Sequence, residues 1–260
     1  MLENKNAIIY GGGGSIGAAV ARRFAREGAT VFLAGRTKKT LDAVARDITA
    51  SGGSAEVAVV DVLDEKAVDD HARAVVAQAG SIDISLNLAS RGDVQGIPLV
   101  EMTTADFVRP ITAGITATFV TARAAARQMI GQGSGVILVL DSGSAGGSPM
   151  MGGTGSADGA TDTFVRNLAT EIGPHGVRVA GVYAAGIPET LTSEKLSAVN
   201  SDLAMDDAAL QGLLASLAEM RILRRSPSLA EIAETLLFLA SDRGGAVTGS
   251  FVNATGMSVR

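Results

Sequence analysis

The stretch from Ala7 to Gly28 constrains the fold of this chain more than any other. It reads AIIYGGGGSIGAAVARRFAREG: a short apolar run, four glycines, and a segment in which Ile16, Val20 and Phe24 recur every four residues. The pattern predicts a buried strand, a tight turn and an amphipathic helix. Such a turn aims backbone N–H groups and a helix N-terminus at a phosphate, and glycine allows both the close approach and a positive φ. On its own, the run also fits an ordinary tight turn.

The composition excludes several classes of function. The chain has 260 residues, a formal net charge of −5 and no block of basic residues, which argues against a nucleic-acid partner. It has no cysteine, so disulfides, thiolate chemistry and cysteine-ligated zinc are excluded. The two histidines, His71 and His175, are far apart in sequence and make a poor set of metal ligands. We therefore expect a small-molecule substrate and no metal.

The ends and the apolar runs of the chain bear on its location. The first expected strand begins within a few residues of Met1, which leaves no room for a signal peptide. No apolar run approaches the length of a membrane span. We expect a cytoplasmic protein without a membrane partner.

Strand-like and helix-like segments alternate along the chain. The strands expected are 7–10, 30–34, 55–60, 82–88, 135–140, 177–183 and 250–254. The helices expected after the first are 41–50, 65–78, 104–130, 154–172 and 229–240, the third of these being interrupted near Pro110. Residues 187–225 are polar and irregular, with some helical pattern, and are expected to vary the substrate pocket.

This alternation predicts a parallel sheet with right-handed crossovers. The fold class is therefore α/β: a single doubly wound (Rossmann) domain spanning residues 1–260, with about seven strands and helices on both faces. In such a fold, ligands bind at the carboxyl ends of the strands.

Further motifs follow the glycine turn in a fixed order. They are Tyr10-Gly11-x-x-x-Ser15-Ile16-Gly17, Asp61-Val62, Asn87-Leu88-Ala89-Ser90, Gly173 to Val179 (GPHGVRV), Ala185-Gly186-x-x-x-Thr190 and Glu231 to Gly256. Together they resemble the single-domain branch of the short-chain dehydrogenase/reductase family, nearly from end to end. The first motif departs from the family's Thr-Gly-x-x-x-Gly-x-Gly pattern, with Ser15 in place of the middle glycine.

The resemblance implies a nicotinamide dinucleotide cofactor. Asp61 corresponds to the family's aspartate on the adenine amine. The full set of cofactor-binding residues that we expect is Gly11, Ser15, Ile16, Gly17, Arg36, Asp61, Val62, Asn87, Ala89, Ile187 and Thr190.

The residues after the second strand bear on the choice of cofactor. A dinucleotide fold that prefers NAD places Asp or Glu there, on the ribose 2′-hydroxyl. This chain has Gly35 followed by Arg36. A guanidinium can hold a 2′-phosphate through charge-assisted hydrogen bonds, which favours NADP(H) over NAD(H). Arg36 could also be a solvated loop charge beside Lys38 and Lys39.

The catalytic positions depart from the family. The resemblance implies a Tyr as general acid, a Lys four residues later, a Ser that orients the carbonyl and an Asn that holds a water. Ser142 occupies the Ser position, whereas Gly155, Gly159 and Gly114 fall at the Tyr, Lys and Asn positions. Only the role of Ser142 can be carried over.

The two glycines on the 154–172 helix allow two explanations. Either a pocket is enlarged there, with Met150 and Met151 as adaptable lining and a bulky ligand reaching in, or a neighbouring element packs closer. For the missing acid, Tyr183 is the most attractive substitute because it is a phenol, although it also fits a half-buried tyrosine at a strand end. The other polar residues near these strand ends are Asp141, Ser144 and Thr154.

Three functions stay open at this point. The first is an atypical NADP(H)-dependent oxidoreductase in which Ser142 with water, the substrate or Tyr183 supplies the proton. The others are a non-catalytic dinucleotide-binding protein, such as a partner subunit, and a cofactor-independent enzyme on the same fold. The resemblance also implies a homo-tetramer or dimer that packs through the long helices at about 111–130 and 154–172 and the final strand.

Overall fold

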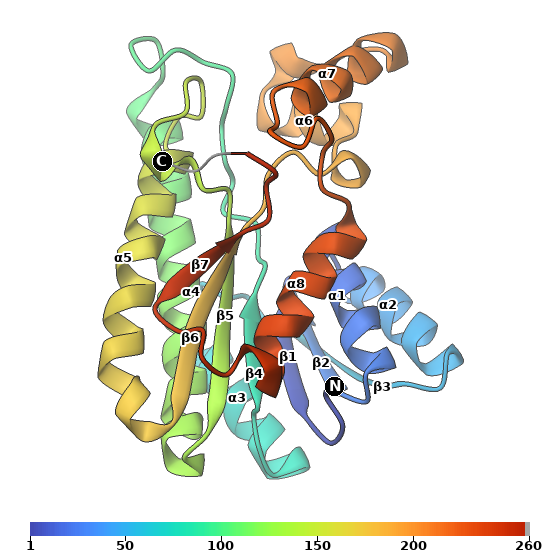
Figure 1. The fold of residues 1–260 in the computed structure, drawn as a ribbon, viewed down its shortest axis with the longest axis vertical. Coiled ribbons are helices and arrows are strands. Elements are labelled where there is room, and N and C mark those ends of the chain that lie inside the picture. Colours follow the sequence, from blue (N-terminus) through green and yellow to red (C-terminus); the bar gives the residue numbers. More distant parts are fainter. Residues whose placement is uncertain (258–260) are drawn as a thin grey trace.

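Seven parallel strands form the centre of the protein in the computed structural model, which describes residues 1–257 (Figure 1). Their order across the sheet is β3-β2-β1-β4-β5-β6-β7. From β1 the chain adds strands on one side (β2, β3) and then crosses to the other side (β4 to β7). The boundary between β1 and β4 is the switch point at which doubly wound folds bind ligands. The strands are β1 (Asn6–Tyr10), β2 (Thr30–Gly35), β3 (Ser54–Val59), β4 (Ile84–Asn87), β5 (Gly135–Asp141), β6 (Val177–Tyr183) and β7 (Ser250–Asn253). The predicted fold class is confirmed.

Helices cover both faces of the sheet and enclose two cores. Strand side chains alternate between the faces, so that Ile9 belongs to one core and Ile8 to the other. The first core lies against α1 (Ser15–Arg26), α2 (Lys38–Ala50) and α8 (Leu229–Ala240). The second lies against α3 (Glu65–Ala79), α4 (Thr104–Gln132) and α5 (Thr154–Ile172).

The helix expected to be interrupted near Pro110 is continuous, so that prediction is wrong. Pro110 lies inside α4, near its N-terminal end, and is buried. Proline removes one helical hydrogen bond, but the surrounding packing holds the turn in place. Gly153, at the start of α5, lies so close that a Cβ there would overlap the carbonyl of Phe107 and lie 3.0 Å from the Pro110 ring.

The segment at 187–225 contains two helices joined by turns. They are α6 (Ser193–Val199) and α7 (Asp207–Glu219), and both lie above the carboxyl ends of the strands (Figure 1). They therefore stand over the expected ligand site. Within residues 1–257, no helix combines the length and the apolar character that crossing a membrane would require.

Candidate active site

The turn between β1 and α1 has the close packing that a phosphate-binding turn needs. Gly11 has φ +78°, and a Cβ there would lie 2.5 Å from the carbonyl oxygen of Leu88. A Cβ at Gly17 would overlap the Gly11 carbonyl. The N-cap residue of α1, Gly14, makes no side-chain cap, and the first turn carries no acidic residue. The first N–H groups of α1 are therefore available to an anion, so the residues present fit a dinucleotide pyrophosphate.

A cavity of about 290 Å³ extends from this turn across the ends of β2 and β3. Arg36, Asp61 and Val62 line it together with Gly11. Arg36 is exposed, and Asp61 accepts a hydrogen bond from the N–H of Leu63 at 3.0 Å. These predicted cofactor residues therefore come together at one end of the site.

A second cavity of about 280 Å³ lies at the ends of β4 and β5. Ile16, Asn87 and Ser142 line it, and it shares Leu88, Ala89 and Ser90 with the first. The two cavities thus adjoin along the carboxyl edge of the sheet. We call the first the adenosine end and the second the chemistry end.

Four predicted cofactor residues lie outside the lining of these two cavities. Gly17 is buried behind the glycine turn, and Ile187 is 2% exposed with its carbonyl accepting a hydrogen bond from the Thr190 hydroxyl at 2.8 Å. Ser15 accepts a hydrogen bond from Nζ of Lys195, on α6, at 2.7 Å. A lysine from the 187–225 segment therefore stands at the start of α1.

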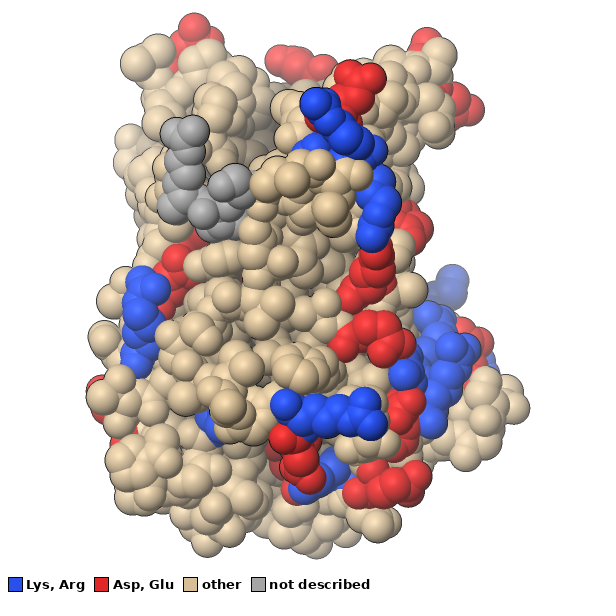
Figure 2. Space-filling view, viewed as in Figure 1, with Lys and Arg blue, Asp and Glu red and all other residues tan. Residues whose placement is uncertain are grey.

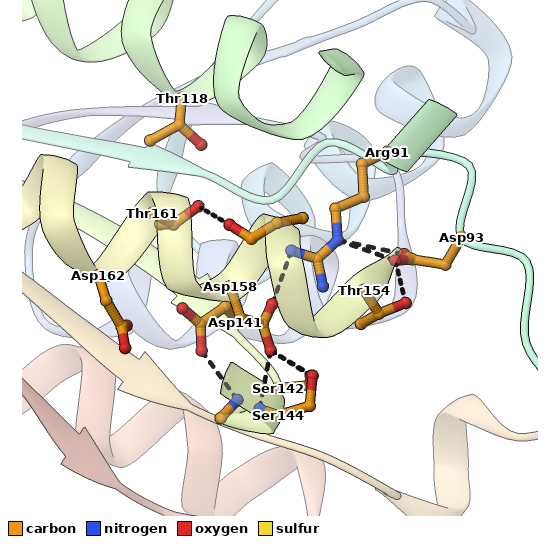
Figure 3. Close-up of polar contacts among 12 residues, drawn as sticks. Arg91, Asp93, Thr118, Asp141, Ser142, Ser144, Thr154, Asp158, Thr161 and Asp162 are labelled. Carbon is orange, nitrogen blue, oxygen red and sulfur yellow. Dashed lines mark hydrogen bonds and ion pairs between the residues drawn. The ribbon is translucent and has the colours of Figure 1, made fainter. Parts of the chain in front are cut away.

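A buried carboxylate, Asp158 of α5, lies beside the chemistry end (Figure 3). Its side chain is 0% exposed. Oδ2 accepts hydrogen bonds from the Ser142 hydroxyl at 2.5 Å and from both the hydroxyl and the backbone N–H of Ser144, at 2.8 and 2.9 Å. Oδ1 forms an ion pair with Nη1 of Arg91 at 2.8 Å. A buried charge is tolerated when it is paired in this way.

Arg91 spans the distance between α4 and α5 in this network. Its Nε donates to Asp93 at 3.0 Å, and Asp93 also accepts a hydrogen bond from Thr154 at 2.7 Å. A Cβ at Gly114 of α4 would lie 3.0 Å from Cδ of Arg91. The arginine side chain therefore occupies the space next to Gly114.

Sequence reasoning missed Arg91 and Asp158. A signal was present, because Asp158 lies on the face of α5 that carries Ala157, Thr161 and Val165, all of which are buried. An aspartate on a buried helix face requires a cation or several hydrogen-bond donors. Which cation would meet it depends on contacts that span the sequence.

A second buried carboxyl, Asp141, ends β5 and lines the chemistry end. It is 2% exposed, and its Oδ1 accepts a hydrogen bond from the Gly143 N–H at 2.9 Å. Its Oδ2 has no hydrogen-bond partner among residues 1–257. Burial, and then the charge of Asp158, raise the pKa of Asp141 to about 8.

The structure gives Tyr183 a different environment from that expected of a replacement acid. Its hydroxyl donates to Asp162 at 3.0 Å, and its ring stacks on Phe251. Burial, and then this hydrogen bond, raise the pKa of Tyr183, so it is a weaker acid than an ordinary phenol. Among the described residues, it is not part of the lining of either end of the site.

Of the two explanations for the glycines of α5, the contact made at Gly155 favours closer packing over an enlarged pocket. A Cβ at Gly155 would lie 3.0 Å from the backbone carbonyl oxygen of Ser144. At Gly152, a Cβ would lie 2.5 Å from the Val94 carbonyl oxygen. Met150 is 45% exposed. At Gly152 and Gly155, glycine therefore permits close packing of the chain, whereas a Cβ at Gly159 would meet only Cβ of Ala145, at 3.8 Å.

Comparisons with known proteins agree with this architecture. The family described as enoyl-(acyl carrier protein) reductase matches residues 12–256. A 3α-hydroxysteroid dehydrogenase of Mediterraneibacter gnavus is 31% identical over 98% of this chain and 97% of its own length. The short-chain reductase protein NovJ of Streptomyces niveus is 29% identical, over 96% and 92%. A crystal structure of NAD⁺-bound xylitol dehydrogenase superimposes with a TM-score of 0.88 at 25% identity, covering 98% of this chain and 99% of that one.

The fold and the glycine turn are of the Rossmann type, a class of fold that binds dinucleotides. The chain belongs to the short-chain dehydrogenase/reductase family. Its relatives are named as dehydrogenases and reductases, which does not favour a non-catalytic or a cofactor-independent protein. Among the described residues, no group of three or more His, Asp or Glu side chains is placed to hold a metal ion.

Proposed function

We propose that this protein is an NADP(H)-dependent oxidoreductase that interconverts an alcohol and a carbonyl in a site without a Tyr-Lys pair. The observation that carries the proposal is the pair of adjoining cavities, with Arg36 at one end and Ser142 at the other. The glycine turn would hold the pyrophosphate, Asp61 the adenine and Asn87 the nicotinamide half. The bound dinucleotide supplies or accepts the hydride.

The choice of NADP(H) rests on the charge around Arg36. Arg36 is exposed and lines the adenosine end, and within residues 1–257 its guanidinium forms no ion pair. The neighbouring Lys38 is engaged with Asp42 at 2.8 Å. A 2′-phosphate would complete the hydrogen-bonding capacity of Arg36.

The absence of the Tyr-Lys pair rests first on the sequence. The chain has two tyrosines, Tyr10 and Tyr183, and the residues four positions later are Gly14 and Ile187. Tyr10 is 1% exposed inside β1. Loss of a general acid costs about 10²–10⁴-fold in rate, so another group must move the proton.

Cofactor titration tests the proposal. We expect NADPH to bind at least about tenfold more tightly than NADH, and Arg36→Ala to remove most of this difference, since one charge-assisted contact is worth about 1.5–3 kcal/mol. Lys39→Ala, on the same exposed segment, is the matched control and should leave the preference unchanged. Equal affinities that Arg36→Ala does not alter would show that Arg36 is a surface charge, and absence of binding of either cofactor would refute the function.

Assembly as a homo-tetramer is part of the same proposal. Phe119 of α4 and Phe164 of α5 form an edge-to-face pair, and Phe119 is 43% exposed. Figure 2 shows that charged side chains are sparse over α5 and the strands beside it compared with the side of α1 and α8. Such a face suits helix-to-helix packing between subunits. Light scattering at micromolar concentration is the test, and a monomer would contradict the expectation.

A further inference from the structure

Hydrogen-bond donors converge on one oxygen of Asp158 in a way that restricts the hydroxyl of Ser142. Ser142 and Ser144 each have a single hydroxyl hydrogen, and both hydroxyls lie within 2.8 Å of Oδ2 of Asp158. The remaining 3.0 Å contact between the two hydroxyl oxygens then has no hydrogen of its own. Ser142 thus donates to Asp158 (Figure 3), and a substrate hydroxyl in the cavity that Ser142 lines would meet its oxygen as an acceptor.

We propose that Ser142 and Asp158 form the proton relay of this enzyme, with Asp158 as the final proton acceptor and Arg91 as the residue that positions it. The inference rests on the proposed oxidoreductase function. In this relay, a serine and a buried carboxylate carry out the proton transfer that a tyrosine and a lysine would otherwise perform. Ser142 is the group that would touch the substrate, and Asp158 acts through it.

The relay works most directly in the direction of alcohol oxidation. The substrate O–H bond breaks and its proton moves to Oγ of Ser142, while the original Ser142 hydrogen moves to Oδ2 of Asp158. A bound oxidised nicotinamide dinucleotide would accept the hydride from the substrate carbon, so that the alcohol would lose two electrons and become a carbonyl. After the carbonyl leaves, the proton returns through Ser142 to water in the cavity. Carbonyl reduction is the reverse.

The surrounding charges stay compensated when Asp158 accepts a proton. Arg91 supplies its counter-charge in a position without solvent, and a guanidinium does not compete for the proton. When Asp158 becomes neutral, Arg91 still has Asp93 as a counter-ion, 3.0 Å away. The other carboxyls near the pair are Asp141 and Asp162, and burial raises the pKa of each. Protonated Asp141 adds no second negative charge beside Asp158.

The first test needs no substrate. In protein labelled with ¹³C at aspartate carboxyls, the Asp158 signal is the one that disappears in Asp158→Asn. We expect that signal at the shift of an ionised carboxylate at pH 7. A protonated Asp158 at pH 7 cannot accept a proton and would overturn the proposal, whatever the outcome for the cofactor.

The second test uses turnover with NADP⁺ and a panel of secondary alcohols, including a polyol and a hydroxysteroid. Ser142→Ala and Asp158→Asn should each lower kcat by at least about 100-fold and leave the Kd for NADPH unchanged. In a double-mutant cycle, Asp158→Asn should cost little once Ser142 is already Ala, because the two act as one unit. Thr163→Val, on the exposed side of α5, is the matched control and should keep full kcat.

The outcomes separate the relay from a structural role. Additive losses, or a Ser142→Ala variant within about threefold of the wild-type kcat, would overturn the relay. If Asp158→Asn does not fold, the pH profile of kcat tests the relay in its place. The relay predicts that the acidic limb of the wild-type profile is missing in Ser142→Ala. Normal NADPH binding without turnover of any alcohol in the panel would count against the proposed function, and the carboxylate signal would still decide the relay.

Discussion

The adenosine end of the site is formed mainly by backbone groups, and the chemistry end mainly by side chains. At the adenosine end, the main contributions are backbone: glycines at positions where a Cβ would overlap a neighbouring carbonyl, and the uncapped N-terminus of α1. At the chemistry end, they are buried charged side chains, with Asp158 and Arg91 at the centre. A backbone site depends on a local run of residues, whereas a side-chain network can be replaced by changes at distant positions. The two ends can therefore change independently of each other.

The largest effect should follow from breaking the ion pair at the chemistry end. Arg91→Met leaves Asp158 at 0% exposure without a cation, which costs about 3–5 kcal/mol of folding free energy. Thermal and urea unfolding measure it. Adding Asp158→Asn to Arg91→Met should recover most of the loss, because no unpaired charge remains. If Arg91→Met alone is as stable as the wild type, Arg91 does not compensate the charge of Asp158.

Placing a tyrosine and a lysine at the positions where the sequence predicts the family's pair should have the next largest effect. In Gly155→Tyr with Gly159→Lys, the new Cβ at 155 lies 3.0 Å from the Ser144 carbonyl oxygen and must displace the turn that donates to Asp158. We expect a loss of about 1–3 kcal/mol from overpacking and no gain in reduction of small ketones. A stable variant with new reductase activity would show that the chemistry end is the family's site with two side chains removed.

A smaller effect, on the pH dependence of stability, is expected from replacing the second buried carboxyl, Asp141. Its pKa of about 8 in the folded protein is above the value of about 3.9 in an unfolded chain. The folded state therefore holds this proton more tightly, and the associated stability is complete below pH 4 and is lost as the pH rises towards 8. Asp141→Asn keeps the acceptor for the Gly143 N–H and removes the titration. Its Tm relative to wild type should rise between pH 5 and pH 8, by about 2–4 °C for each kcal/mol; a constant difference would contradict the raised pKa.

The smallest effect concerns Lys195, which reaches the start of α1 from α6. It is exposed and lies 2.7 Å from Ser15, where its charge would meet a pyrophosphate. Lys195→Met should weaken NADPH and ADP binding by about three- to tenfold, in keeping with the modest value of an exposed charge. Adenosine, which has no phosphate, should bind equally to both proteins. An equal loss for adenosine would mean that α6 acts through packing.

The two ends also differ in how far the sequence alone predicts them. The alternation of strands and helices, the glycine turn and the place of Arg36 after the second strand could be inferred because each depends on local spacing. The pairing of Arg91 with Asp158 could not, since it joins residues that lie 67 positions apart by their numbers. The same holds for Gly155, where the contact with Ser144 decides whether a glycine opens a cavity or permits close packing. For Pro110, packing against α5 outweighs the local preference for a break.

The most direct test of this division is to measure the Kd for NADPH and kcat on Arg36→Ala and Ser142→Ala in parallel. We expect each variant to change one of the two quantities and to leave the other nearly unchanged. Arg36→Ala should raise the Kd about tenfold or more and leave kcat at saturating cofactor within about threefold, while Ser142→Ala should leave the Kd unchanged and lower kcat at least about 100-fold. If each variant changes both quantities to a similar extent, the two ends do not act separately and the account is wrong.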